Sequence, residues 1–222
     1  MNKIIRRGLL PLRLLPFLLL FYACSGPKGK IYTEGKQWKY SCVFYTPNGQ
    51  VEDSFLIDLK VQANAIALLA GQIPIIYEYT SGGEKIQETT GVIEEEEMVS
   101  IHQPRMGKLS FTQILPMPTV GYPLGYKSES TIETKIEKSP FTELNGKIVK
   151  QARRTLAPDS VSYKGTFIKC FTYEAENASL VQELGQYHLK YWFNAEKGFV
   201  RYLYTKPDGG TVVINLIEVT EQ

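Results

Sequence analysis

The chain has 222 residues, with 25 lysines and arginines against 23 acidic residues, so its formal net charge is only +2. This balance excludes the concentrated positive charge of a nucleic-acid binder, and the length suffices for one hydrophobic core. One local basic cluster is read as the solvated face of a strand, with contact to anionic headgroups or glycans as the alternative; it comprises Lys147, Lys150, Arg153 and Arg154.

Residues 1–23 have the pattern of an export signal peptide, with a cationic start and a leucine-rich stretch over residues 14–21. A permanent membrane span is not expected, because residues 9–22 fall short of the ~20 apolar residues that a span requires and are interrupted by Pro11, Arg13 and Pro16. Removal of this segment would take four basic side chains with it. The mature part would then carry 21 basic and 23 acidic side chains, a net charge of −2.

The end of this segment, Phe21-Tyr22-Ala23-Cys24, resembles the lipobox of bacterial lipoproteins. It matches at Ala23 and Cys24 and departs in having Phe21 where leucine is usual and a bulky Tyr22. The resemblance implies that Cys24 carries lipid, and two or more acyl chains anchor a protein stably. Plain secretion and a buried structural cysteine are the alternatives.

The residues after Cys24 bear on where such a lipoprotein would reside. In the family's sorting logic Ser25 favours the outer membrane. The following stretch is basic rather than acidic, which favours the periplasmic side over the cell surface. Residues 24–35 are interpreted as the lipidated cysteine and a flexible tether rich in glycine, proline and lysine, and residues 36–222 as one domain.

The domain begins with a strongly predicted hairpin. Apolar residues alternate with polar ones over residues 38–44 and again over 55–61, which is typical of half-buried strands. Pro47-Asn48-Gly49 separates the two runs, and Asn-Gly readily takes the positive φ that tight hairpin turns require.

Further strands are predicted along the rest of the chain, and together they indicate a mainly β protein with a single antiparallel, strongly bent sheet that forms an incomplete barrel. One or two short helices are expected at residues 63–69 and 178–184. Turn residues such as Pro158 and Asp159 separate the runs. The predicted strands are 75–80, 85–93, 98–103, 109–115, 128–137, 147–155, 166–174, 187–193, 199–205 and 211–219.

Cys42 and Cys170 form an even pair if Cys24 carries lipid, which allows one disulfide in an oxidising compartment. Such a bond would stabilise the fold by about 3–5 kcal/mol in the chain-entropy model. Two separate buried thiols are the equally supported alternative, since cysteine is among the most buried residue types.

The search for catalytic and metal-binding patterns finds none that predicts a site. His102 and His188 do not lie at metal-ligand spacing from other ligands, and no cofactor-binding glycine loop is present. Cys170 would be a nucleophile only with a histidine in hydrogen-bond reach. The acidic run 94–97 is interpreted as a solvated turn. The chain is therefore expected not to be an enzyme and to need no metal or cofactor.

Two segments resemble an exported family of uncharacterised bacterial proteins: the closing strands from Tyr187 to the Asp208-Gly209 turn, and the proline-rich segment 115–121. That family is similar in turn to the lipoprotein carriers LolA and LolB. The resemblance implies a strongly bent antiparallel sheet, an incomplete barrel, around an apolar cavity that receives acyl chains.

These observations favour a membrane-anchored, periplasm-facing binding or carrier module for an apolar ligand such as a lipid or an acylated peptide. The alternative is a structural or assembly lipoprotein that binds an envelope protein. Aromatic residues on the strands are the candidate ligand contacts, unless they simply fill the core; they are Trp38, Tyr191, Trp192 and Phe193.

Overall fold

The structure, a computed structural model, describes residues 30–62, 71–136, 145–177 and 185–221. The predicted signal peptide, Cys24 and both predicted helices, 63–69 and 178–184, lie outside these residues. The described chain contains thirteen strands and one 3₁₀ helix. The elements are β1 (Lys36–Tyr45), β2 (Val51–Val61), β3 (Ile73–Ser81), β4 (Glu84–Glu94), β5 (Met98–Ile101), η1 (Gly107–Ile114), β6 (Thr119–Gly121), β7 (Glu129–Lys135), β8 (Ile148–Thr155), β9 (Asp159–Tyr163), β10 (Thr166–Asn177), β11 (His188–Asn194), β12 (Gly198–Thr205) and β13 (Thr211–Glu221).

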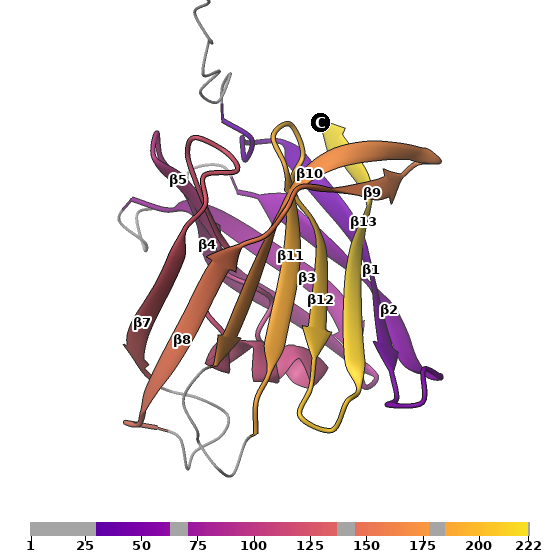
Figure 1. Cartoon of the computed structure of the whole chain (residues 1–222). Helices are drawn as coiled ribbons and strands as arrows, with labels where there is room; N and C mark the ends of the chain where they lie inside the picture. Colours follow the sequence, from indigo (N-terminus) through magenta and orange to yellow (C-terminus); the bar gives the residue numbers. More distant parts are fainter. Residues whose placement is uncertain (1–29, 63–70, 137–144, 178–184, 222) are drawn as a thin grey trace, which may run out of the picture.

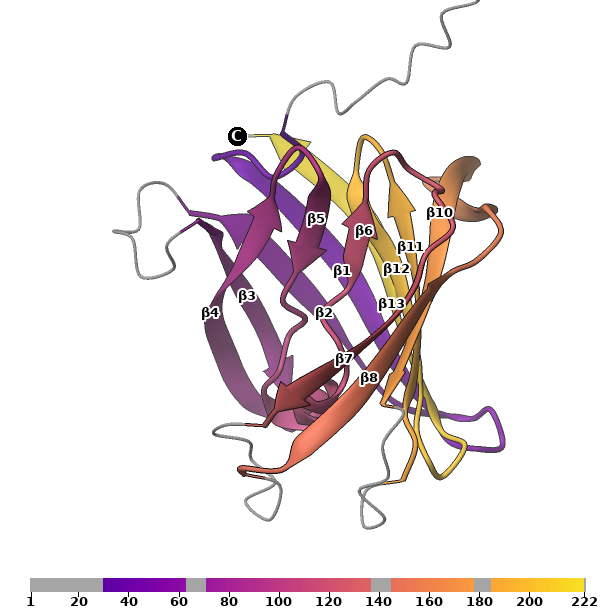
Figure 2. The same ribbon diagram turned by 60° about the vertical axis from the view of Figure 1, so that its left-hand side comes forward.

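The strands form one antiparallel sheet in the order β6-β5-β4-β3-β2-β1-β13-β12-β11-β10-β8-β7. Nearly all sheet neighbours are also neighbours in the chain. The exceptions are β8 with β10, which have β9 between them in the chain, and β1 with β13. The pairing of β1 with β13 joins the two ends of the domain from Lys36↔Glu221 to Tyr45↔Thr211. The sheet bends strongly into an incomplete barrel with β6 and β7 as its edges (Figures 1 and 2). The predicted fold class is confirmed.

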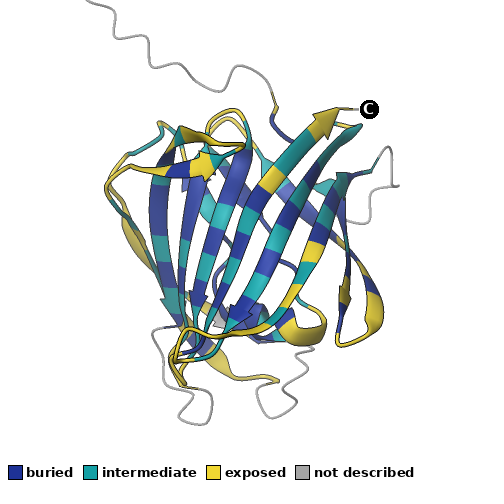
Figure 3. Ribbon diagram, turned by 90° about the vertical axis from the view of Figure 1, so that its right-hand side faces the viewer, coloured by how far each residue is buried: buried dark blue, intermediate teal, exposed yellow. Residues whose placement is uncertain are grey.

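The predicted hairpins account for most of this architecture. The first one, β1 with β2, turns at Gly49, whose φ of 78° is the positive value expected for the Asn-Gly turn. Along the strands, buried residues alternate with partly exposed ones (Figure 3), because successive side chains point to opposite faces of the sheet.

Aromatic side chains fill much of the concave face. Phe199 packs edge-on against Phe193 at 5.1 Å between ring centroids, and its ring lies 5.9 Å from that of Tyr191. The Tyr40 hydroxyl donates a 3.0 Å hydrogen bond to the Phe199 carbonyl. Tyr40 thus buries its ring and still has a hydrogen-bond partner for its hydroxyl group. This part of the interior is therefore a packed core.

The strand predicted at 109–115 is wrong, because that segment forms the 3₁₀ helix η1. Its buried residues include Leu109, Phe111, Thr112 and Ile114. The pairs Leu109–Thr112 and Phe111–Ile114 are three residues apart, which matches the three-residue turn of a 3₁₀ helix. A short apolar run does not distinguish the two states by period alone. In Figure 1 this helix lies at the end of the barrel opposite to the chain termini.

Two short strands were not predicted. Thr119–Gly121 forms β6 against β5, and Asp159–Tyr163, predicted to begin with a turn at Pro158-Asp159, forms β9 against the first half of β10. The β9–β10 ribbon lies across the outer side of the sheet near the end that carries the termini (Figure 1). A strand of three to five residues leaves too few alternations to be recognised in sequence.

The packed domain starts earlier than the predicted boundary at residue 36. Ile31 and Tyr32 are buried, and their backbone N–H groups donate to the Glu94 carboxylate at 2.5 and 3.0 Å. The sequence carries no periodic signal here, because Ile31 and Tyr32 are only two apolar residues in a stretch rich in glycine and lysine. Their partner Glu94 belongs to the acidic run that was predicted to be a solvated turn. Residues 95–97 are indeed exposed, but Glu94 holds the start of the domain in place.

Candidate functional site

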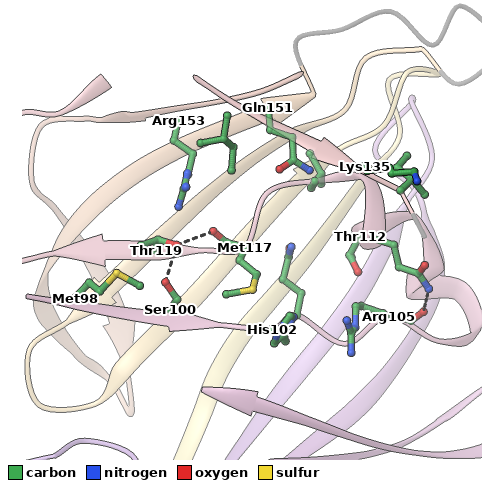
Figure 4. Close-up of a pocket in the computed structure, with 15 residues that line it drawn as sticks. Met98, Ser100, His102, Arg105, Thr112, Met117, Thr119, Lys135, Gln151 and Arg153 are labelled. Atoms are coloured by element: carbon green, nitrogen blue, oxygen red, sulfur yellow. Dashed lines mark hydrogen bonds between the residues drawn. The ribbon is translucent and has the colours of Figure 1, made fainter. Parts of the chain in front are cut away.

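A cavity of about 540 Å³ lies where the two ends of the sheet meet. One wall comes from β5, β6 and the segment through η1, and the opposite wall comes from β7 and β8 (Figure 4). This volume is within the range of small-molecule pockets in proteins. The lining residues are Met98, Ser100, His102, Gln103, Arg105, Thr112, Gln113, Leu115, Met117, Thr119, Ile132, Lys135, Ile136, Gln151 and Arg153.

The cavity forms because the sheet is bent so strongly that its two ends overlap. On β5, Val99 and Ile101 face the core, so Ser100, which alternates with them, faces the other way and lines the cavity. The Ser100 hydroxyl donates to the hydroxyl of its cross-strand partner Thr119 at 2.8 Å. Figure 4 shows Arg153 and Gln151 of β8 pointing toward this strand pair. The paired edge strands β5 and β6 thus lie inside the opposite end of the sheet.

Hydrogen bonds join the two overlapping ends of the sheet at the margins of the cavity. The Gln151 side chain donates to the Ile114 carbonyl at 3.2 Å. The Tyr191 hydroxyl donates to the Thr119 carbonyl at 2.8 Å and accepts from the Thr119 N–H at 3.2 Å. Because β6 is held by a side chain of the distant strand β11, the cavity walls are fixed relative to each other.

The charge in the cavity is of one sign, since its lining contains no aspartate or glutamate but includes arginine and lysine. The Arg105 guanidinium is bound at 2.9 Å by the Glu88 carboxylate behind the wall, so its charge is compensated. Arg153 differs, because its buried Nε has no hydrogen-bond partner in the described structure. Arg153 thus brings a positive charge to the cavity wall, although its Nε itself is buried from solvent.

Five of the fifteen lining residues are apolar. Met98, Met117 and Ile132 are partly exposed at the cavity, and Leu115 and Ile136 are buried beneath it. Methionine side chains adapt to apolar ligands of varied shape. A cavity that combines apolar side chains with polar and cationic ones fits an amphiphile better than a purely polar or purely apolar molecule.

His102 lies in the cavity wall as a neutral imidazole. Its burial, and then the nearby Arg105 charge, lower the pKa of His102 from its ordinary 6.5 to about 4. Both effects disfavour the imidazolium form. At neutral pH His102 thus adds no positive charge to the cavity and serves as a polar, uncharged wall residue.

This pKa predicts a pH dependence of stability. Below pH ~6.5 the unfolded chain takes up a proton at His102 that the folded chain does not, so stability falls as the pH drops from about 6.5 to about 4. We expect a loss of roughly 1–3 kcal/mol. Urea unfolding at several pH values should show that His102→Gln removes this component, whereas His188→Gln retains it. Equal pH dependence in wild type and His102→Gln would contradict the assignment.

Three predicted ligand residues lie in the packed core and not at the cavity. Trp38, Tyr191 and Phe193 are almost fully buried, and none of them lines the cavity. Trp38 stacks on Tyr32 at 4.8 Å between ring centroids and donates through its indole N–H to the Lys197 carbonyl at 2.8 Å. These three residues match the alternative interpretation, in which the aromatic side chains fill the core.

Trp192 is on the outer side of the sheet, where the β9–β10 ribbon covers it. Its side chain is 4 % exposed, and its indole N–H donates to the Asp159 carboxylate at 3.1 Å. The cations of Lys190 and Arg201 lie 4.7 and 5.0 Å from its ring. Trp192 therefore holds the ribbon to the barrel and, although it was a candidate ligand contact, does not line the cavity.

Cys42 and Cys170 are separate, buried thiols in the structure and form no disulfide. Cys42 is on β1 and Cys170 on β10, four strand positions away. Four strand spacings are about 19 Å along the sheet, whereas a disulfide requires Cα atoms within ~7 Å. Burial raises the pKa of Cys170 to about 11, and its Sγ donates to the Ile168 carbonyl at 3.5 Å.

Among the described residues, no group of three histidine, cysteine or acidic side chains is arranged to hold a metal ion. In the same part of the chain, no helix has the length and apolar character needed to cross a membrane.

The sequence did not single out the cavity residues. Met98, Met117 and Ile132 come from segments far apart in the chain, and no shared pattern connects them. Arg153 was assigned to a solvated strand face. The alternation on β8 carries a usable signal, since Val149 and Gln151 are buried and Arg153 shares their face.

Comparison with known proteins reaches the level of fold. No protein-family profile and no curated protein matches the sequence. The crystal structure of a candidate lipoprotein of Parabacteroides distasonis superposes with a TM-score of 0.52 at 15% identity over 85% of this chain and 96% of that one. This similarity shows a shared fold.

Two further structures align over similar lengths with lower scores. A candidate exported protein of Bacteroides fragilis with a YmcC-like fold gives a TM-score of 0.49 at 13% identity, covering 85% of this chain and 97% of that one. The hypothetical lipoprotein YmcC of Escherichia coli gives 0.37 at 10% identity, covering 87% and 90%. The structural neighbours are thus described as lipoproteins or exported proteins.

Proposed function

We propose that the protein is a lipid-anchored binding or carrier module of the cell envelope, which accommodates an amphiphilic ligand in the cavity between the overlapping sheet ends. The observation that carries the proposal is the composition of this cavity, which combines methionine, leucine and isoleucine side chains with the cationic Arg153 and contains no carboxylate. The role is non-catalytic, with the buried Cys170 thiol held protonated at neutral pH by its raised pKa.

The membrane attachment rests on Cys24 and its similarity to a lipobox. The acyl chains place the protein at a membrane, and the residues that follow Cys24 favour the periplasmic side of the outer membrane. The fold shared with a candidate lipoprotein is consistent with this location.

The ligand class follows from matching the cavity to chemistry. The apolar part of a single-chain lipid or an acylated peptide would pack against Met98, Met117 and Ile132, and an acidic or phosphate headgroup would accept a hydrogen bond from Arg153. Charge-assisted bonds of this type are stronger than neutral ones. An anionic amphiphile should therefore bind more tightly than a zwitterionic one.

A pair of isoleucine variants tests the proposal. Ile132→Glu places a carboxylate in the cavity, whereas Ile148→Glu makes the same change at a side chain that is 61% exposed on the neighbouring strand. Native mass spectrometry of delipidated protein with lysophosphatidylglycerol should show binding by wild type and Ile148→Glu. Affinity should fall about tenfold or more in Ile132→Glu, since each ~1.4 kcal/mol of lost binding is one factor of ten.

Two results would reject the carrier hypothesis in this form. One is the absence of retained lipid in the wild type. The other is equal binding by Ile132→Glu and Ile148→Glu, which would place the ligand outside the cavity. Lysophosphatidylcholine in place of lysophosphatidylglycerol then tests the headgroup preference attributed to Arg153.

The second hypothesis, a structural lipoprotein that binds an envelope protein, has the sheet edge as its natural surface, since an edge strand can pair with a strand of another protein. Within the described sheet β7 is such an edge, but Glu129, Glu133 and Lys135 lie along it. Charged side chains on an edge discourage pairing. The cavity is therefore the better supported site.

A further inference from the structure

One end of the barrel gathers both termini of the described chain. Lys36 at the start of β1 forms a 3.2 Å ion pair with Glu221 at the end of β13, and the Glu94 carboxylate binds the backbone of Ile31. Figures 1 and 2 show the β6–β7 loop and the β9–β10 ribbon at this same end. We call this end the anchor pole, comprising residues 30–36, 94–98, 122–128, 156–169, 195–197 and 218–221.

Hydrogen bonds confirm that these segments share one end. The Tyr122 N–H donates to the Glu97 carbonyl at 2.8 Å, which joins the β6–β7 loop to the turn after β4. The tip of the ribbon contacts the end of β13, because Lys164 pairs with Glu218 at 3.0 Å and the Tyr163 hydroxyl accepts from the Val219 N–H.

The anchor pole carries two highly exposed aromatic side chains, Tyr126 at 71% and Phe167 at 80%. In the described part of the chain the other large apolar side chains with high exposure are aliphatic or methionine. Each aromatic residue lies on a projecting segment, the β6–β7 loop or the β9–β10 ribbon. Aromatic rings are the side chains that prefer the boundary between water and lipid.

One lysine lies close in sequence to each of these two aromatic residues. Lys127 follows Tyr126, and Lys169 lies two residues from Phe167 on the same face of β10; both lysines are exposed. Across the ribbon from Phe167 and Lys169 lie Ser162 and Ser160, which add no negative charge to that face. The pole as a whole contains nine acidic and six basic side chains, but the acidic ones lie outside the loop 122–128 and outside the ribbon face of Phe167 and Lys169. They are Glu34, residues 94–97, Asp159, Glu196, Glu218 and Glu221.

The length of the tether brings this end to the membrane. Glu94 holds Ile31 and Tyr32 on the domain, so only residues 25–30 are available as a linker between Cys24 and the domain. Six residues at ~3.6 Å each span at most about 22 Å. Acyl chains on Cys24 would thus enter the bilayer close to the anchor pole.

We propose that the anchor pole docks on the bilayer surface, with Tyr126 and Phe167 inserted at the lipid interface and Lys127 and Lys169 against anionic headgroups. The proposal rests on the proposed lipid attachment at Cys24. The bilayer is the occupant because the tether starts at this pole, and because rings flanked by lysines match the chemistry of a membrane surface. Docking gives the anchored domain a fixed orientation, with the ribbon side down.

A tryptophan pair reports on this orientation. In Phe167→Trp the new indole is at the anchor pole, and in Val51→Trp it is on the β1–β2 hairpin at the opposite end, at a position that is 63% exposed in the wild type (Figure 1). The natural Trp38 and Trp192 are buried and give both variants the same background. The lipidated full-length proteins are reconstituted into vesicles of phosphatidylglycerol and brominated phosphatidylcholine.

We expect both variants to float with the vesicles, and only Phe167→Trp to lose fluorescence to the brominated lipid and shift to shorter wavelength. Flotation of both variants with equal or no quenching overturns the docking while leaving the anchor intact. Failure of both to float overturns the anchor and with it the docking. Crosslinking of residue 167 to an envelope protein in cells, without quenching in vesicles, assigns the pole to a protein partner and also overturns the proposal.

Discussion

Replacement of Cys24 by alanine should move the protein from the membrane fraction to the aqueous phase. The attachment is attributed to acyl chains on this sulfur, each buried methylene contributing ~0.8 kcal/mol, so that loss of two or more chains removes the binding almost completely. Detergent cloud-point partition of the wild type and of Cys24→Ala measures the change.

The control for this prediction is Ser25→Ala, which alters the neighbouring residue and leaves the sulfur in place. It should partition with detergent like the wild type. A wild type that already partitions into water, or a mature protein whose first residue is not Cys24, would refute lipid attachment and favour plain secretion.

Gly198→Ala is expected to be the most destabilising small substitution, at about 3 kcal/mol or more. Gly198 has φ +78°, which disfavours any side chain, and an added Cβ would lie 2.4 Å from the Tyr32 hydroxyl oxygen. Tyr32 cannot easily move, since it is buried, stacks on Trp38 and accepts a hydrogen bond from the Phe199 N–H at 3.2 Å.

Gly49→Ala is a matched control, because Gly49 has the same φ of +78° with nothing within 4 Å of the added Cβ. It should lower stability by only ~1 kcal/mol, the contribution of the backbone conformation alone. Urea unfolding of both variants gives the difference. Equal destabilisation would mean that the N-terminal segment does not pack against the β11–β12 turn.

The hairpins were predictable from sequence because their information is local. Alternating side chains in β1 and β2 and the Asn48-Gly49 turn specify that pair, and the alternation in β11 does the same near the C-terminus. Bending of the sheet was also expected, since long antiparallel sheets twist.

The parts that could not be predicted depend on contacts between distant segments. The segment from Gly107 to Ile114 is buried against strands that follow and precede it by many residues, and its short apolar run fits either a strand or a helical turn. Trp192 alternates with Tyr191 and Phe193 as a strand residue should, but the sequence does not show that β9 covers the outer face.

The cavity was missed for the same reason. A LolA-like resemblance predicted an apolar cavity lined by core aromatics, whereas Tyr191 and Phe193 are packed and the space lies outside β5–β6. The polar character of the cavity comes from residues that include Arg153, Gln151 and Ser100. They become neighbours only because the edge strands β5 and β6 lie inside the opposite end of the sheet. No local pattern encodes that overlap.

The most direct test of the central claim is to locate the ligand. Lysophosphatidylglycerol with a photoreactive group on its acyl chain is bound to the full-length protein, irradiated, and the labelled peptides are identified. The account predicts labels at Met98, Met117 and Ile132, from three separate segments that meet at the cavity. Labels confined to the outer face of the sheet or to the anchor pole would contradict it.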